Sequence, residues 1–156
     1  MKLSHIAPDG SIAMVDVSEK SHTLRFARAE AYVAMNEEAR QALREATLPK
    51  GDAFVAAQLA GILAAKQTPA LIPLTHSLPL AGVEVGFEWC NDGRLRVEAQ
   101  ARTTAQTGVE MEAMVAAAIA ALTIYDMCKA LDKGIAIETV RLLEKSGGKS
   151  GTWRAK

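Results

Sequence analysis

The chain has 156 residues, 49% of them hydrophobic and 23% charged, with 18 basic and 18 acidic side chains. These values are typical of one soluble domain with a sizeable core, and the zero net charge argues against a nucleic-acid binder that works by bulk electrostatics. Cys90 and Cys128 lie far apart and have no histidines at ligand spacing, which argues against a disulfide framework and a zinc site. The N-terminal residues contain no apolar signal segment, so we expect a cytoplasmic protein.

The first half of the chain predicts one strand and two helices. Residues 1–22 are mostly polar, and we expect an extended arm there. Residues 24–35 alternate small or apolar with charged side chains, which favours a strand, although their alanine content also suits a helix. Asn36 and Asp52 are the expected N-caps of a short helix and of a helix over residues 52–66. The second helix is expected to form its apolar face from Phe54, Val55, Leu59, Ile62 and Leu63.

The middle of the chain predicts a β-hairpin. Residues 69–79 hold three prolines, which predicts an apolar loop pinned against the core. Residues 83–89 and 95–101 then alternate apolar and polar positions on either side of Asn-Asp-Gly at 91–93. This pattern is typical of two antiparallel strands joined by a tight turn.

The longest predicted element is a helix over residues 107–133, closed by Gly134. Its uncharged, alanine-rich centre at 113–125 is shorter than the roughly 17–25 residues of a membrane span, so we expect a core helix buried on most of its circumference. Glu110 and Asp126 stand near its two ends, about 24 Å apart at 1.5 Å per residue. Either these ends serve different purposes, or a second chain brings its own glutamates to the first chain's aspartate.

After the long helix, residues 135–143 predict a further strand, and the Gly-rich residues 146–156 predict a mobile tail. The order of elements is β-α-β-β-α-β with one additional helix. We therefore predict an α+β domain of ferredoxin-like fold over residues 23–145. Its antiparallel sheet is expected to be covered by helices on one face and by another chain on the other.

Asp126 and Lys129 are the first candidates for chemistry. They lie three residues apart, so they share one face of the predicted helix. The pair is either an ordinary surface ion pair or an acid/base unit in a partly buried cleft. Lys50 precedes Gly51 and the Asp52 N-cap, and it belongs either to a plain charged loop or to an anion site at the start of a helix.

The other polar candidates are ambiguous when taken singly. His76 lies in the proline-bracketed loop, either as a hydrogen-bonded structural residue or as a catalyst. Glu110 and Glu112 are expected to interact with the dipole at the helix start, and their spacing makes them no obvious metal pair. Lys145 and Lys149 form no Walker A motif, because its first glycine and following helix are absent, so they belong to a disordered tail or to a mobile basic flap over an anionic ligand. Spacing alone supports an oligomeric α+β domain with an anion site.

Several segments taken together resemble one known family. They are MVDVS (14–18), TLRFARAEA (23–31), KGD (50–52), LAGILAAKQTPALIPLTHSLPL (59–80), TGVEMEAMVAAAIAALTIYDMCKA (107–130) and VRLLEKSGGKSG (140–151). Over nearly the whole chain they resemble the MoaC family of cyclic pyranopterin monophosphate synthases. The resemblance implies a lyase that converts 3′,8-cyclo-7,8-dihydro-GTP into cyclic pyranopterin monophosphate with loss of diphosphate, in molybdenum cofactor biosynthesis. It also implies homohexamers, built as trimers of dimers, with each active site at a dimer interface.

The resemblance also assigns roles to residues through their positions in the family's motifs. It implies no metal or cofactor held by the protein, and leaves open whether Mg²⁺ accompanies the triphosphate. The family's catalytic residues fall on Asp126, Lys129 and Lys50, for which we expect proton transfer and stabilisation of charge on the leaving diphosphate. Its substrate-binding residues fall on Leu74, Thr75, His76, Glu110, Met111 and Glu112, with Arg25 and Lys145 near the phosphates.

One loop departs from the family's usual pattern. The family usually has LCHPL where this chain has LTHSL, at residues 74–78. Thr75 replaces a thiol by a hydroxyl and Ser77 removes a proline, so we expect a less rigid loop and altered substrate affinity with the same reaction. Two other classes stay open on residue patterns alone: a non-catalytic ferredoxin-like module that senses a nucleotide, and a purely structural oligomer.

Overall fold

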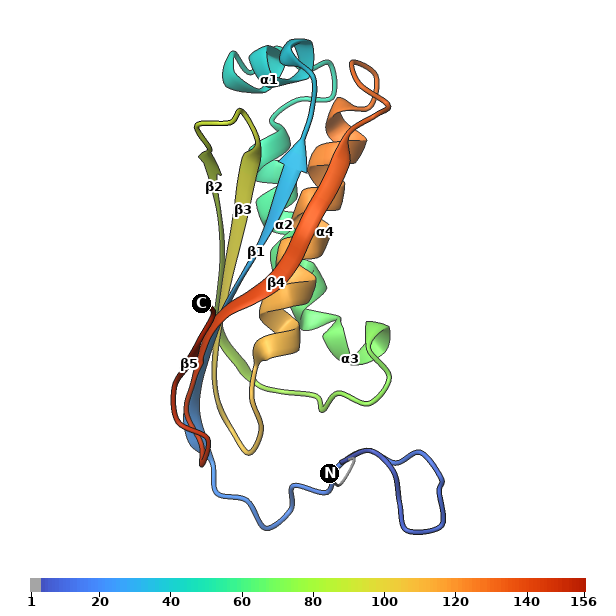
Figure 1. The fold of residues 1–156 in the computed structure, drawn as a ribbon, viewed down its shortest axis with the longest axis vertical. Coiled ribbons are helices and arrows are strands. Elements are labelled where there is room, and N and C mark those ends of the chain that lie inside the picture. Colours follow the sequence, from blue (N-terminus) through green and yellow to red (C-terminus); the bar gives the residue numbers. More distant parts are fainter. Residues whose placement is uncertain (1–3) are drawn as a thin grey trace.

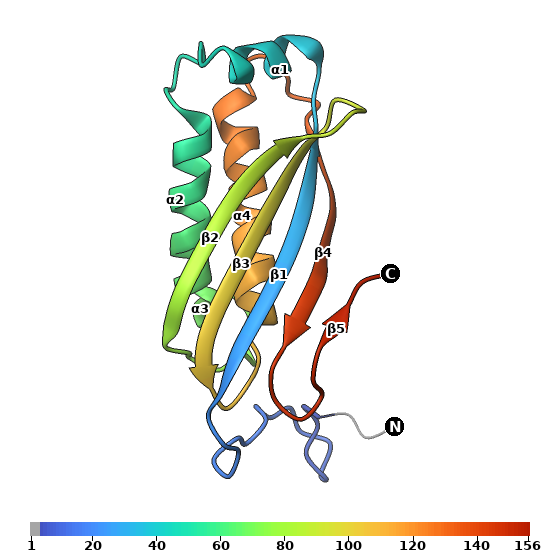
Figure 2. The ribbon, with the colours of Figure 1, turned by 90° about the vertical axis from the view of Figure 1, so that its left-hand side faces the viewer.

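The computed structural model describes residues 4–156, which form a two-layer α+β fold (Figure 1). Within these residues, five antiparallel strands make one sheet in the order β2-β3-β1-β4-β5, and the long helices α2 and α4 lie on one of its faces (Figure 2). This arrangement confirms the predicted ferredoxin-like fold with an additional helix. Residues 1–3 of the predicted arm lie outside the described part. The elements are β1 (Thr23–Ala34), α1 (Glu37–Arg44), α2 (Ala53–Lys66), α3 (Thr68–Leu71), β2 (Leu80–Trp89), β3 (Leu95–Ala105), α4 (Glu110–Cys128), β4 (Ala136–Ser146) and β5 (Trp153–Arg154).

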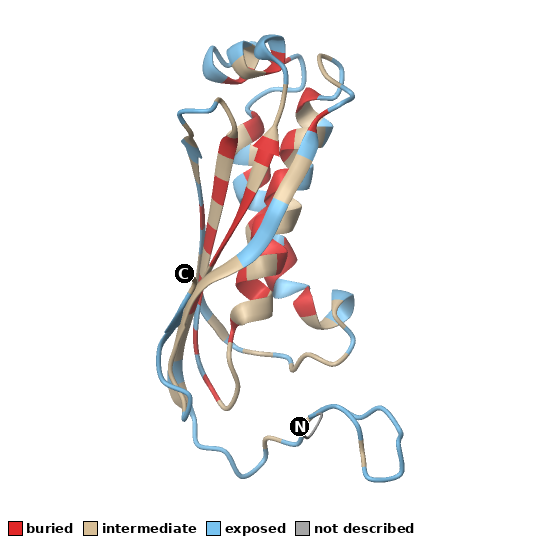
Figure 3. Cartoon of the chain, viewed as in Figure 1, coloured by how far each residue is buried: buried red, intermediate tan, exposed pale blue. Residues whose placement is uncertain are grey.

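The face of the sheet that meets the helices is built from small apolar side chains. Ala29 of β1 and Val85 of β2 both lie opposite Ala99 of β3, and all three are buried. Successive residues of a strand point to opposite faces, so this alternation fixes the register of the sheet. The buried positions recur along the inner faces of the strands and of α4 (Figure 3). The predicted apolar row of the hairpin faces this core through Val83, Val85, Phe87 and Trp89.

The opposite face of the sheet carries charged side chains. Glu30 of β1 is held by Arg96 of β3 at 2.6 Å and by Arg141 of β4 at 2.8 Å. Antiparallel sheets commonly leave such a polar face in water. The polar side chains give no hydrophobic reason for a second chain to cover this face, and that expectation stays a prediction.

The helices α2 and α4 approach each other through small residues. A Cβ placed on Gly61 of α2 would lie 2.9 Å from the main-chain oxygen of Ala116 in α4. The expected apolar face of α2 is only partly confirmed: Phe54 and Ile62 pack against the core. Val55, Leu59 and Leu63 are at least half exposed. The close approach of α4 leaves no room for them. The buried positions of α2 are Ala53, Ala57, Gly61, Ala64 and Ala65.

Helix α4 is shorter at both ends than the predicted range 107–133. Beyond Cys128, the N–H groups of Leu131 and Asp132 both donate to the Cys128 oxygen, and these bonds end the helix before Gly134. By length and composition α4 is apolar enough to cross a membrane, but half of its apolar stretch is buried inside the fold. It is therefore a core helix, as predicted.

The end of the chain folds back on β4. The predicted strand over 135–143 is confirmed as β4 and extends to Ser146. Residues 146–156, expected to form a mobile tail, contain the short strand β5. Its residue Arg154 lies opposite Glu144, and the N–H of Ala155 donates to the Leu143 oxygen at 2.8 Å.

Candidate active site

One group of predicted residues meets at the C-terminal end of α4. Asp126 accepts a hydrogen bond on Oδ1 from Lys129 Nζ at 2.7 Å and one on Oδ2 from Lys50 Nζ at 3.0 Å. Lys50 Nζ also donates to the main-chain oxygen of Asp126 at 3.1 Å. The three residues line a cavity of about 410 Å³, together with Pro49, Tyr125, Met127, Ala130 and Lys133.

Lys50 reaches α4 because the loop after α1 folds back on the helix end. Ala46 and Gly51 have φ angles of 53° and 101°, which turn the chain on either side of Lys50. Between them Leu48 is buried and anchors the loop to the core. The loop thus delivers Lys50 to a carboxylate that lies 76 residues away in the sequence.

The alternative anion site at the start of α2 is occupied by the protein itself. Asp52 Oδ1 accepts hydrogen bonds from the N–H groups of Phe54 and Val55 at 3.0 and 3.1 Å. These are the N–H groups that an anion would need. Lys50 therefore serves the end of α4 and not the start of α2.

The electrostatics of Asp126 are set by its two lysine partners. Hydrogen bonds from Lys129 and then Lys50 lower the pKa of Asp126, and the bond to Asp126 raises the pKa of Lys129. At neutral pH the carboxylate is ionised and the lysine keeps its proton. The Asp126 side chain is 55% exposed, so the partly buried cleft in our alternative interpretation is wrong for a single chain. The two side chains do pair as their spacing predicts.

The second group of predicted residues lies at the N-terminal end of α4. His76 Nε2 lies 2.6 Å from the main-chain oxygen of Val15. Since a carbonyl oxygen only accepts, Nε2 carries the proton, and Nδ1 is the ring nitrogen left for a ligand. Thr75 Oγ1 donates to the Ile72 oxygen at 2.8 Å, which ties the loop to itself. A cavity of about 460 Å³ is lined by Leu74, Thr75, His76, Glu110, Met111 and Glu112, among others.

Glu112 is a buried carboxyl group, 3% exposed, in the first turn of α4. Burial raises its pKa to about 7, and the neighbouring Glu110 acts in the same direction. Both protonation states are therefore populated at neutral pH, which is the property of a general acid or base. The sequence predicts an interaction of Glu112 with the helix dipole and, by resemblance, a place near the substrate, but its burial was not predicted.

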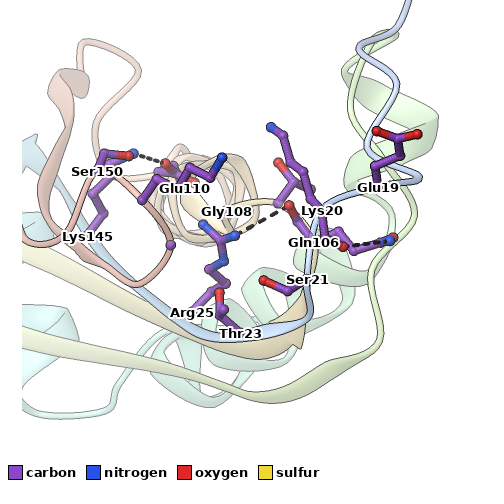
Figure 4. Close-up of a pocket in the computed structure, with 13 residues that line it drawn as sticks. Glu19, Lys20, Ser21, Thr23, Arg25, Gln106, Gly108, Glu110, Lys145 and Ser150 are labelled. Carbon is purple, nitrogen blue, oxygen red and sulfur yellow. Dashed lines mark hydrogen bonds and ion pairs between the residues drawn. The ribbon is translucent and has the colours of Figure 1, made fainter.

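Arg25 and Lys145 line a neighbouring cavity of about 790 Å³. Lys145 Nζ donates to Glu110 Oε1 at 2.9 Å, and Arg25 donates to the main-chain oxygen of Gln106 at 3.4 Å (Figure 4). Glu110 lines this cavity and the previous one, so the two form a continuous region at the start of α4.

The 790 Å³ cavity has a surplus of positive charge. Its basic lining residues are Lys20, Arg25, Lys145 and Lys149, against the two acids Glu19 and Glu110. A surplus of this kind attracts anions, and phosphates in particular. Lys20 was not predicted as a site residue, because it lies in an arm without regular structure.

The structure thus divides the predicted residues between the two ends of α4. The cavity at Asp126 shares no lining residue with the two cavities at Glu110. Sixteen residues of continuous helix separate the two acids, which is about 24 Å. Across the described residues 4–156, no three His, Cys, Asp or Glu side chains are grouped so as to hold a metal ion.

Comparison with known proteins agrees with the resemblance in the sequence. A sequence model described as the MoaC family matches residues 14–148. The chain is also 51% identical, over 152 residues, to a protein of Corynebacterium glutamicum (strain R) named cyclic pyranopterin monophosphate synthase. This similarity covers 97% of each of the two chains.

Proposed function

Because the chain belongs to the MoaC family, we propose that it is a cyclic pyranopterin monophosphate synthase of molybdenum cofactor biosynthesis. Its substrate is 3′,8-cyclo-7,8-dihydro-GTP, and its products are cyclic pyranopterin monophosphate and diphosphate. The observation that carries the proposal is the 51% identity to a synthase of that name over 97% of both chains. The grouping of the implied site residues around three cavities supports it.

The proposed reaction joins a ring rearrangement to an internal phosphoryl transfer. A triphosphate becomes a cyclic monophosphate when a hydroxyl of the same molecule bonds to the α-phosphorus and the bond from that phosphorus to the bridging oxygen breaks. The hydroxyl gives up its proton, and diphosphate leaves with the bonding electrons. No electrons pass to another molecule, so the reaction needs no redox cofactor and is of the phosphorus–oxygen lyase type. Mg²⁺ enters this proposal only as a counter-ion of the triphosphate.

In this proposal, Asp126, Lys129 and Lys50 carry out the proton transfers. The ionised Asp126 accepts protons from the substrate, and the two protonated lysines donate them or stabilise negative charge on the leaving group. The hydrogen bonds of 2.7 and 3.0 Å around Asp126 support a shared role. Each Asp126 oxygen accepts one lysine hydrogen bond and keeps a second lone pair, so the exposed carboxylate can also accept a hydrogen bond from the substrate.

The residues at the start of α4 bind the substrate in this account. Glu110, Glu112 and His76 offer hydrogen-bond partners to the polar edge of the ring system, alongside Leu74, Thr75 and Met111. Arg25 and Lys145 bind phosphate oxygens in the adjoining basic cavity.

We further propose that two chains complete each site, so that Glu112 of one chain faces Asp126 of its partner. The separation of about 24 Å within one chain supports this arrangement. Assembly into a homohexamer, a trimer of dimers, is consistent with the exposed apolar residues Val55, Leu59 and Leu63 on α2 and Leu122 on α4. A cytoplasmic location follows from the nucleotide-derived substrate.

The direct test incubates the purified protein with 3′,8-cyclo-7,8-dihydro-GTP and measures released diphosphate beside a sizing measurement. The proposal predicts diphosphate and cyclic pyranopterin monophosphate in equal amounts from an oligomeric protein. The rival function, a nucleotide sensor without catalysis, predicts that the substrate binds and is recovered intact. A structural oligomer predicts neither turnover nor binding of a triphosphate.

A further inference from the structure

Lys133 lines the same cavity as Asp126. The proposed function gives it no part in proton transfer or in substrate binding. The cavity is lined by three lysines, Lys50, Lys129 and Lys133, and by one acid, Asp126. Asp126 is already paired with the first two. Among residues 4–156, no carboxylate lies within ion-pair distance of Lys133, so the cavity has two surplus positive charges.

The position of Lys133 is fixed by the turn that follows α4. Tyr125 Oη donates to the main-chain oxygen of Lys133 at 3.1 Å. Asn36, the N-cap of α1, donates from its side chain to the Leu131 oxygen at 3.1 Å and from its N–H to Asp132 Oδ2 at 2.8 Å. These bonds hold the backbone at Lys133 against the end of α4. Its ammonium group therefore stays within reach of the cavity.

A favourable interaction with the dipole of α4 does not explain why a lysine stands at position 133. Cations interact favourably with a helix C-terminus only within its last turn. Lys129 follows directly on Cys128 and satisfies that condition, whereas Lys133 lies five residues beyond the end of α4. The surplus charge therefore points to an anion that occupies the cavity with Asp126.

We propose that Lys133 binds a phosphate oxygen of the substrate in the Asp126 cavity. The inference rests on the proposed function, which brings a triphosphate to this site. A lysine ammonium suits the task because it acts as a mobile point charge toward phosphate. Lys133 thereby leaves Lys50 and Lys129 free for proton transfer while the charge of the phosphates is balanced.

The test compares Lys133→Gln with Lys133→Arg and Lys66→Gln. Lys66 ends α2, is exposed and lines none of the three cavities, so it controls for the loss of one positive charge. The readouts are kcat and KM for 3′,8-cyclo-7,8-dihydro-GTP and the Kd for inorganic diphosphate by calorimetry. Lys133→Gln is expected to raise KM and this Kd about tenfold with kcat within about twofold, whereas both other variants stay close to the starting protein.

A Lys133→Gln variant whose KM and diphosphate Kd both stay within about twofold of the starting protein overturns the inference. So does a loss confined to kcat, which would make Lys133 part of the chemistry and not of binding. If the starting protein releases no diphosphate, the proposed function fails. The calorimetric comparison with inorganic diphosphate still decides whether Lys133 binds phosphate.

Discussion

Lys50 Nζ lies 3.0 Å from Asp126 Oδ2 and 3.1 Å from the main-chain oxygen of the same residue. One ammonium group therefore neutralises the carboxylate and satisfies one of the last carbonyl groups of α4, which have no partner within the helix. The contact joins the loop after α1 to the end of α4. It makes Asp126 the centre of a cluster that two distant parts of the chain build together.

Replacing Asp126 by Asn removes the negative charge that both lysines share. We expect kcat to fall by about 100-fold or more, which is the usual contribution of a positioned proton-transfer group. The variant should remain folded, because the side chain is more than half exposed. Steady-state turnover measures the fall in kcat, and circular dichroism checks that the variant is folded. Glu45→Gln, at an exposed residue, is the control for removing one negative charge. Near-normal turnover in a folded, oligomeric Asp126→Asn protein would refute the acid/base role.

The pKa of Glu112 makes the stability of the protein depend on pH. Burial raises this pKa from 4.5 to about 7, so the folded state prefers the protonated form. The stabilisation is complete below pH 4.5 and is lost as pH rises through 7. The shift corresponds to about 3 kcal/mol.

The variant Glu112→Gln cannot ionise, so it escapes this loss. Compared with the starting protein, its free energy of unfolding should be about 3 kcal/mol higher at pH 8 and nearly equal at pH 4.5. Urea unfolding at one fixed protein concentration measures both. If the variant and the starting protein differed in free energy of unfolding by the same amount at both pH values, Glu112 would not be the group that titrates.

Gly148 keeps Arg25 in place in the basic cavity. Its φ of 72° lies in the left-handed region, and a Cβ there would lie 2.6 Å from Arg25 Cζ. Gly151 has a φ of 63° with nothing within 4 Å of the same position. Both alanine variants therefore share a backbone penalty of about 1–2 kcal/mol, and only Gly148→Ala displaces the guanidinium.

We expect Gly148→Ala to raise KM several-fold above that of Gly151→Ala, with similar thermal stability for the two. Parallel kinetics and melting curves make the comparison. Identical KM values would mean that Arg25 does not contact the substrate.

Gly61 allows α2 to approach α4. A Cβ on Gly61 would lie 2.9 Å from the Ala116 oxygen and 2.9 Å from Val85 Cγ2. Overpacking of this kind destabilises by about 1–3 kcal/mol, against a gain of about 1 kcal/mol from the helix propensity of alanine. The two effects together should lower the free energy of unfolding of Gly61→Ala by about 1 kcal/mol. Gly86→Ala, which meets nothing within 4 Å, should change it little, and an equally stable Gly61→Ala protein would contradict the close packing.

The fold was predictable because local signals agree with the final packing. The structure contains three of the predicted local features. They are the alternation of β1, the hairpin turn at Gly93, and the Asn36 cap, whose side chain accepts a hydrogen bond from the N–H of Ala39. The direction of the apolar face of α2 was not predictable. Side-chain size alone does not reveal that α4 approaches closely enough to require glycine and alanine on the inner side.

The site was predictable only in part. Spacing on one helix paired Asp126 with Lys129, but Lys50 and Lys133 join them through turns whose geometry depends on the tertiary structure. The burial of Glu112 depends in the same way on the elements packed around α4. The residue pattern singled out Lys50 for a charged loop or an anion site, and only the resemblance to the family grouped it with Asp126. Lys133 was not predicted, because only its nearness to the end of the helix indicates it.

The central claim is that one site needs Asp126 from one chain and Glu112 from another. It is tested by producing Asp126→Asn and Glu112→Gln chains separately and then together in one cell. Each variant alone should form oligomers with little turnover. Mixed dimers contain one site with both native residues, so co-production should restore roughly a quarter of the starting turnover per chain. A mixed oligomer as inactive as its parents would contradict the claim.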